Sequence, residues 1–185
     1  REAQKHRIYQ IGLRWCAGKG NAPRWLSWTF VHLSFTCRLM TPEILQPGQL
    51  LARGVCRHLR DLDFTCLEEF SPERGKRLDV MALGPKGEFW IVECKSSRAD
   101  FTADAKWSGY LEWSDRYFWA VDPEFPVDLL PHDTGLIIAD SFGAEVVRMP
   151  DATPLASARR RALTFRFARC AALRMQALRD PMGLL

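Results

Sequence analysis

The residues best suited to chemistry are a carboxylate and an amine two positions apart, Glu93 and Lys95, at the end of the apolar stretch FWIVECK. Side chains along a β-strand alternate between the two faces of a sheet, so these two side chains point the same way. A third charged residue, Asp79, lies in the alternating segment RLDVMAL, which a GPKG turn joins to FWIVECK. The turn predicts a hairpin that brings Asp79 beside Glu93. Glu93 and Lys95 are then either an ion pair at a sheet edge, which stabilises little, or part of a reaction centre with Asp79.

Carboxylates that converge on one point repel each other unless a cation lies between them. Their hard oxygen atoms suit Mg²⁺ or Mn²⁺, and such an ion can activate water and neutralise the charge that develops on a phosphodiester. A lysine beside the ion can orient or deprotonate the attacking water, or stabilise the charged phosphorus centre. Two further acids, Glu68 and Glu69, end the strand-like segment FTCLEEF. Because strand residues alternate, we expect only one of the two to face the site.

The elements that must position these residues are read from the periodicity of apolar residues and from Pro and Gly punctuation. A helix is predicted first, with one apolar face in GQLLARGVCRHLRDL. Strands are predicted over 64–70, 77–83 and 88–95, then a helix over 99–114, strands over 116–121, 135–140 and 144–149, and a C-terminal helix over 155–179. An antiparallel meander followed by a helix and more strands predicts an α/β fold with a mixed β-sheet flanked by helices.

The 185 residues are enough for one domain with additional sequence at its ends. We expect the domain to span residues 40–185, where the pattern is regular, and residues 1–39 to form a poorly structured basic extension. An apolar run over 25–35 follows basic residues as in an export signal, but polar residues interrupt it and no small-residue cleavage site follows. The run is too short to span a membrane, so no membrane association is expected.

Charge is unevenly distributed along the chain. Residues 1–40 and residues 153–180 each hold seven Lys or Arg and one acid, whereas residues 41–152 hold 12 basic and 20 acidic residues. Acidic clustering suits metal binding and cationic flanks suit a polyanion such as nucleic acid, although charged blocks are also common on solvated faces. The six cysteines show no CxxC and no paired Cys/His spacing, which suits a reducing compartment such as the cytoplasm.

These residues resemble a known nuclease pattern. LDV at 78–80, the hairpin and IVECK at 91–95 look like the signature of the PD-(D/E)xK nuclease superfamily, and the helix–three-strand–helix–strand order matches its restriction-endonuclease-like core. The run ECKSSRADFTADAKWSGYLEWSDRYFWAV, with LLPHDTGLIIAD downstream, resembles the MmcB-like bacterial DNA-repair proteins over about residues 47–180. The resemblance implies a Mg²⁺- or Mn²⁺-dependent nuclease that hydrolyses DNA phosphodiester bonds in repair, with DNA and other repair proteins as partners.

The resemblance also implies roles for individual residues. Asp79 and Glu93 would be metal ligands, the backbone carbonyl of Cys94 a further ligand, and Lys95 the catalytic lysine. The superfamily often supplies another acid from the first helix, but residues 50–59 contain no Asp or Glu. Glu69, or in second place Glu68, would substitute for it from the first strand.

Other basic residues are candidates for DNA binding. Lys106 and Tyr110 are four residues apart, so a helix would place them on one face, and they resemble an element of RecB-like members of the superfamily. The C-terminal helix carries Arg159, Arg160 and Arg161 on a basic surface that suits phosphate contact. A solvated helix explains the same arginines equally well, and a counterbalance to the charge of the acidic core is a third explanation.

Two other functions fit the same sequence. The fold could serve as a non-catalytic DNA- or protein-binding platform in repair. The intact Asp79, Glu93 and Lys95 argue against this alternative, whereas the missing helix acid keeps it open. Alternatively, the substrate could be RNA, because no feature of the sequence discriminates the 2′-hydroxyl group.

Overall fold

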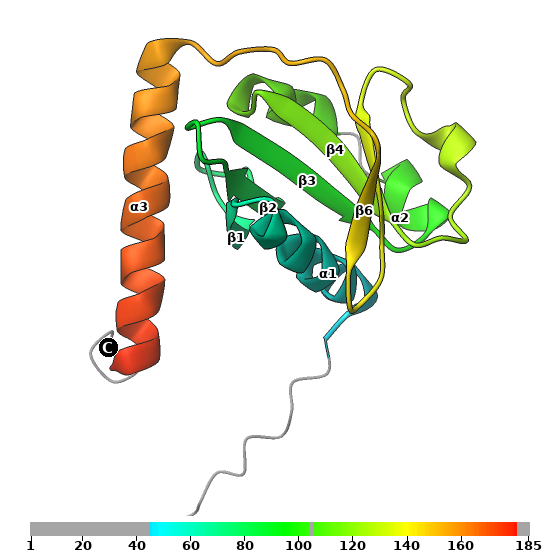
Figure 1. Cartoon of the computed structure of the whole chain (residues 1–185), viewed down its shortest axis with the longest axis horizontal. Helices are drawn as coiled ribbons and strands as arrows, with labels where there is room; N and C mark the ends of the chain where they lie inside the picture. Colours follow the sequence, from blue (N-terminus) through cyan, green and yellow to red (C-terminus); the bar gives the residue numbers. More distant parts are fainter. Residues whose placement is uncertain (1–44, 104–105, 181–185) are drawn as a thin grey trace, which may run out of the picture. The chain divides into compact units, whose positions relative to one another are not determined.

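The computed structural model of the protein describes residues 45–103 and 106–180, and the extension expected over residues 1–39 lies outside them. The elements follow one another in the expected order (Figure 1). The helices are α1 (Pro47–Asp61), α2 (Arg98–Ala103) and α3 (Ser157–Arg179), with short 3₁₀ helices η1 (Trp107–Trp113) and η2 (Val127–Leu129). The strands are β1 (Thr65–Phe70), β2 (Leu78–Leu83), β3 (Phe89–Lys95), β4 (Arg116–Val121), β5 (Gly135–Ala139) and β6 (Ala144–Arg148).

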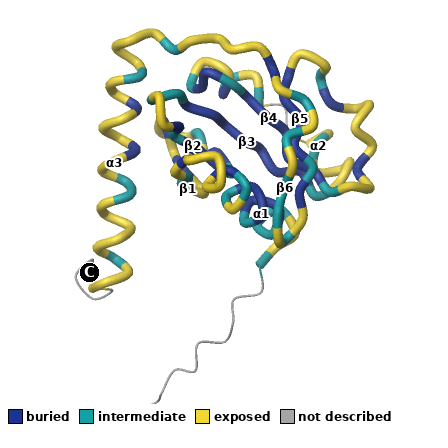
Figure 2. Tube along the Cα trace, in the orientation of Figure 1, coloured by how far each residue is buried: buried dark blue, intermediate teal, exposed yellow. Residues whose placement is uncertain are grey.

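The six strands form one mixed sheet in the order β1-β2-β3-β4-β5-β6. β1, β2 and β3 form the expected antiparallel meander, β3, β4 and β5 run parallel, and β6 returns antiparallel at the edge. Parallel neighbours need crossover connections, which the segments containing α2, η1 and η2 provide. β3 lies inside the sheet and all seven of its residues are buried (Figure 2). The predicted α/β fold, a mixed sheet flanked by helices, is confirmed.

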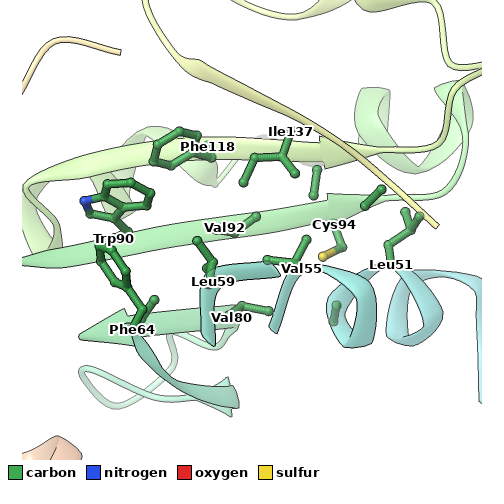
Figure 3. Packing of buried hydrophobic residues seen from close by; sticks show 14 residues of the cluster. Leu51, Val55, Leu59, Phe64, Val80, Trp90, Val92, Cys94, Phe118 and Ile137 are labelled. Carbon is green, nitrogen blue, oxygen red and sulfur yellow. The ribbon is translucent and has the colours of Figure 1, made fainter. Parts of the chain in front are cut away.

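One face of the sheet is covered by α1, which contacts all six strands. The helix begins with Pro47, whose fixed φ suits the first turn, and the backbone N–H of Gln46 donates to Oε1 of Gln49 at 2.8 Å. Apolar residues at helical spacing then face the sheet, as the periodicity predicts. Figure 3 shows this core, which includes Leu51, Val55 and Leu59 of α1 and Val80, Val92, Cys94, Phe118 and Ile137 of the strands.

The opposite face is covered by aromatic residues of α2 and η1 and by two residues of α3, Leu163 and Phe167. The ring centroid of Phe167 lies 5.8 Å from that of Phe70 in β1 and 6.1 Å from that of Phe89 in β3. Most of the remaining α3 surface is exposed (Figure 2). No helix in the described part of the chain is long and apolar enough to cross a membrane.

The segment predicted as one helix over 99–114 is interrupted, and that prediction is wrong. α2 ends at Ala103, and the chain re-forms as the 3₁₀ helix η1 from Trp107. Three large aromatic residues of η1, Trp107, Tyr110 and Trp113, are spaced three apart and all belong to the core beneath the sheet. A 3₁₀ helix has three residues per turn, so it places all three on one side, which an α-helix does less well.

Asp115 fixes the beginning of α3 to the sheet. Its buried carboxylate receives two hydrogen bonds from the guanidinium of Arg160, at 2.6 and 2.8 Å. It also accepts the backbone N–H groups of Phe89 at 2.7 Å and Leu155 at 2.9 Å. Arg160 donates a further hydrogen bond to the carbonyl of Gly87 at 2.7 Å. One carboxylate therefore connects the starts of β3, β4 and α3.

Candidate active site

A pocket of about 510 Å³ opens where β1 and β3 end and β2 begins. Its wall is acidic and includes the carboxylates of Glu68, Glu69, Asp79, Glu93 and Asp100. Arg77 and Lys95 supply positive charge, and the start of α1 closes one side with Gln46, Gly48, Gln49 and Ala52. The strand pairs β1–β2 and β2–β3 are antiparallel, so the end of β1 and the end of β3 both lie beside the start of β2. The acids at these three positions therefore lie close together.

Asp79 and Glu93 lie side by side across the β2–β3 pair. The backbone N–H of Asp79 donates to Oε1 of Glu93 at 3.3 Å. In turn, Oδ2 of Asp79 accepts the backbone N–H of Cys94 at 2.8 Å. Each carboxylate is thus held by the backbone of the other strand, and the structure brings together the residues whose spacing suggested a common site.

The environment of Asp79 disfavours its negative charge. Burial is the largest cause and raises the pKa of this carboxyl group, and the nearby carboxylates of Glu69 and Asp100 raise it further. The N–H of Cys94 and the ammonium of Lys95 act in the opposite direction, but the pKa remains above its ordinary value. A cation between these oxygen atoms would relieve this cost.

Lys95 is buried despite its charge, with only 6% of its surface exposed. Its Nζ lies 5.7 Å from the ring centroid of Trp119, a fully buried residue on the neighbouring strand β4. An ammonium over the face of an indole is a favourable cation–π contact. The aromatic ring therefore helps to hold Lys95 on the same side of the sheet as Glu93.

The side chain and the backbone carbonyl of Cys94 lie in different surroundings. Its side chain packs in the core beneath α1 (Figure 3), and burial raises the pKa of its thiol, which keeps it neutral. Its carbonyl oxygen faces the first turn of α1, where a Cβ added to Gly48 would lie 3.9 Å away. Cys94 lines the same pocket as Asp79 and Glu93.

The two acids at the end of β1 both line the pocket, and Glu69, but not Glu68, is among the groups that raise the pKa of Asp79. Glu69 has a φ of 50°, in the left-handed region, which interrupts the regular alternation of side chains in the strand. The carboxylate of Glu69 also forms an ion pair with Arg77 at 2.9 Å. Glu69 is thus partly neutralised by Arg77.

Lys106 and Tyr110 are not equivalent in the structure. Tyr110 is buried and lines the pocket. Lys106 is exposed, precedes the 3₁₀ helix and is not among the residues that border the pocket. Lys106 and Tyr110 were predicted as a pair because one α-helix would place them on the same face. Since that helix is interrupted, they do not share such a face.

The three consecutive arginines of α3 lie far along the sheet from the acids, at the start of β3 and β4. Arg160 is bound to Asp115, as described above. Arg159 donates to the carbonyl of Glu112 at 2.8 Å and to its carboxylate at 3.0 Å. Arg161 is exposed and lies over the ring of Phe165. Nearer the pocket, a different residue of α3, Arg174, donates to the backbone carbonyls of Glu68 and Glu69.

The donor set at the pocket fits a small divalent ion. Within residues 45–103 and 106–180, no three His, Cys, Asp or Glu side chains converge as a complete metal site. Mg²⁺ does not require one, since it is commonly bound by one or two carboxylates and several waters. Asp79, Glu93 and the Cys94 carbonyl would supply three hard oxygen ligands.

Two parts of the pocket were missed from the sequence. Gln46 and Gln49 lie at the start of α1, and the Pro at the first helical position was the available signal. The second part is Asp100, in the first turn of α2. Its N–H does donate to Oγ of Ser97, but its carboxylate accepts the N–H of Ser96 and borders the pocket.

Comparison with known proteins agrees with this architecture. Residues 44–182 match the family model described as DNA repair protein MmcB-like. A solved structure of a protein of unknown function from Silicibacter pomeroyi is 66% identical, with a TM-score of 0.74, and the match covers 76% of this chain and 96% of that chain. No curated protein is significantly similar to the chain. Since the family model matches well over half of the sequence, the chain belongs to the MmcB-like family of DNA repair proteins.

Proposed function

We propose that the protein is a metal-dependent nuclease that hydrolyses phosphodiester bonds of DNA during repair. The observation that carries the proposal is the convergence of Asp79, Glu93 and Lys95 at the ends of neighbouring strands, inside a pocket lined with acids. Membership of a DNA repair family supports DNA as the partner. The helix–three-strand–helix–strand order also agrees with the restriction-endonuclease-like core of the PD-(D/E)xK superfamily.

In this proposal Asp79, Glu93 and the carbonyl of Cys94 hold Mg²⁺ or Mn²⁺. The bound ion would lower the pKa of water and neutralise charge on the phosphate. Lys95 lies two residues beyond Glu93 on the same side of the strand, where its ammonium can orient the attacking water or stabilise the negative charge that develops on the phosphate oxygens. Tyr110 and the first turn of α1 also line the pocket.

A second function, a DNA- or protein-binding platform without catalysis, is favoured by one observation. The first turn of α1 presents Gln46 and Gln49 to the pocket instead of an acid. Neutral amides contribute less to binding a divalent ion than carboxylates do. The two functions differ in whether the pocket binds a metal and cuts DNA.

A cleavage panel tests the proposal. The purified protein is incubated with flap, junction, mismatch, abasic, single-stranded and plain duplex DNA, in Mg²⁺, in Mn²⁺ or in EDTA. We expect cleavage of at least one substrate with either ion and none in EDTA, and loss of that cleavage in Asp79→Asn. Binding of DNA without cleavage of any substrate would favour the platform function.

A further inference from the structure

The turn between β5 and β6 presents a large aromatic ring to solvent. Phe142 is 76% exposed, more than any other aromatic residue among the exposed large hydrophobic residues of the described chain. Exposed single hydrophobic residues are common on flexible loops and need no explanation there. This turn differs because hydrogen bonds within it and contacts with α1 fix its backbone.

Hydrogen bonds within the turn fix its backbone. Oδ1 of Asp140 accepts the N–H groups of Phe142 at 2.7 Å and Gly143 at 2.8 Å. The backbone N–H of Asp140 donates to the carbonyl of Gly143 at 3.0 Å. The ring of Phe142 is therefore carried by a closed, hydrogen-bonded loop of four residues.

Helix α1 holds the same turn from outside. Arg53 donates to the carbonyl of Ser141 at 3.0 Å, and Arg57 donates to the carbonyls of Ser141 at 3.4 Å and Phe142 at 3.3 Å. The backbones touch directly at Gly54, where an added Cβ would lie only 2.0 Å from the carbonyl oxygen of Asp140. Helix and turn thus form a rigid unit, and folding does not use the Phe142 ring to fill the core.

The turn lies at the same end of the sheet as the acidic pocket. β3, β4 and β5 run parallel, and the register places Lys95 beside Val121 and Val121 beside Ile138. Two strand spacings separate Lys95 from Ile138, which is roughly 10 Å. The turn begins two residues beyond Ile138, so a nucleic-acid strand needs to extend only a few nucleotides from the pocket to reach Phe142.

The surroundings of the ring suit a base more than a phosphate. A shallow hollow of about 440 Å³ adjoins Phe142, and the carboxylates of Asp140 and Glu145 line it. Carboxylates repel phosphate groups but accept hydrogen bonds from the exocyclic amino groups of bases. The apolar ring can stack on the face of any base. Arg53 and Arg57 add positive charge on the side of α1.

We propose that Phe142 stacks on an unpaired base of the DNA strand that enters the acidic pocket. The inference rests on the proposed nuclease function and specifies its substrate class, which is single-stranded DNA or a duplex with unpaired bases beside the cut. In an intact duplex each base is already stacked on its neighbours, so the ring would have no free base to bind without first unstacking one.

Binding to oligonucleotides that contain 2-aminopurine tests this directly, because stacking on an aromatic ring changes the fluorescence of this base. The full chain is titrated, in EDTA to prevent cleavage, with single-stranded DNA and with duplex DNA of the same sequence. The variants are Phe142→Ala, Phe142→Trp and, as a matched control on α3, Phe165→Ala, which removes a ring that is 61% exposed. Cleavage with Mg²⁺ is measured in parallel.

We expect Phe142→Ala to weaken single-strand binding by about tenfold or more, to abolish the fluorescence change and to leave duplex binding unaltered. Phe142→Trp should retain both signals, and Phe165→Ala should behave as the wild type. Equal binding and fluorescence in Phe142→Ala and the wild type would overturn the inference, even if the wild type cuts DNA. If the stacking signals depend on Phe142 but no variant cuts DNA, the base-binding role stands and the nuclease function fails.

Discussion

Asp79 is the residue on which the candidate site depends. Glu93 and Lys95 alone would form a local ion pair, but Asp79 joins them from the neighbouring strand through hydrogen bonds with Glu93 and Cys94. Burial and neighbouring acids raise the pKa of Asp79, so the folded chain maintains an arrangement that a divalent cation would stabilise. Stabilisation by a ligand in this way is expected when the ligand binds only the folded state.

Substitution of Asp79 should therefore abolish metal binding without unfolding the protein. Asn is isosteric with Asp, and its side-chain oxygen can still accept the N–H of Cys94, but it lacks the negative charge. We expect calorimetric titration with Mn²⁺ to give binding for the wild type and none for Asp79→Asn. Glu124→Gln, which changes an exposed acid outside the pocket, should bind as the wild type does. Equal heats for Asp79→Asn and the wild type would remove Asp79 from the metal site.

Asp115, at the other end of the strands, has a pKa shifted in the opposite direction to that of Asp79. Burial alone would raise the pKa of its carboxyl group, but hydrogen bonds from Arg160 and from the N–H groups of Phe89 and Leu155 outweigh burial. The pKa lies below its ordinary value of 3.8. Asp115 is therefore a structural carboxylate, and its low pKa predicts how stability depends on pH.

A carboxyl group with a lower pKa in the folded state stabilises the fold when it is ionised. This contribution is complete above the pKa of the unfolded chain, near 4, and is lost as the pH falls through the folded pKa. We expect the wild type to be more stable than Asp115→Asn at pH 7, and the difference in melting temperature to shrink below about pH 4. A difference that stays constant down to pH 3 would contradict this role of the charge.

At the level of elements, α3 is held to the sheet by a few strong contacts. Only Leu163 and Phe167 of its residues are buried, and Arg160 fixes its first turns to Asp115. Arg174, further along the helix, contacts the end of β1. The helix thus extends from the start of β3 to the acidic pocket.

Arg160→Ala should consequently destabilise the protein far more than substitution of its neighbour. Removing Arg160 leaves the buried carboxylate of Asp115 without its ionic partner, at a cost of about 3 kcal/mol. Arg161 is exposed and contacts only the Phe165 ring among the interactions described, so Arg161→Ala should change stability by about 0.5 kcal/mol or less. Urea unfolding of both variants measures the difference. Equal stabilities would show that α3 is held by its apolar contacts alone.

The elements themselves were largely predictable, because the strands and α1 follow simple periodicity. The alternation of β2 and β3 was enough to place Asp79, Glu93 and Lys95 on one side. The sequence could not indicate the left-handed backbone of Glu69, which brings a second acid to the pocket. Nor could it indicate the pairing of Asp115 with Arg160, since residues 45 positions apart meet only through tertiary packing.

Within residues 45–103 and 106–180, acidic side chains gather at the pocket and arginines gather on α3. All seven charged residues of α3 are arginines. Some of these have structural partners, but Arg166 and Arg169 are exposed and form no ion pair with any residue that the structure describes. If DNA lies along this helix, these two arginines, and not Arg159 or Arg160, are available to phosphates.

The salt dependence of DNA binding tests this assignment. Each phosphate contact contributes about −0.9 to the slope of log K against log salt concentration. We expect the double substitution Arg166→Gln and Arg169→Gln to reduce the slope by about two without affecting the melting temperature. A double substitution of Glu73→Gln and Glu124→Gln, exposed acids outside the helix, serves as the control. An unchanged slope in the arginine variant would place the DNA on another surface.

The central claim is that Asp79, half-buried, together with the buried Glu93 and Lys95, cuts DNA. The most direct test is the cleavage rate of a labelled oligonucleotide in Mg²⁺ or Mn²⁺, for the wild type and for Lys95→Met. Met keeps the length of the side chain and its packing near Trp119 but removes the ammonium. With both proteins folded, we predict cleavage by the wild type and a rate at least about a hundredfold lower in Lys95→Met. Equal rates in the two proteins, or no cleavage by the wild type with either ion, would contradict the account.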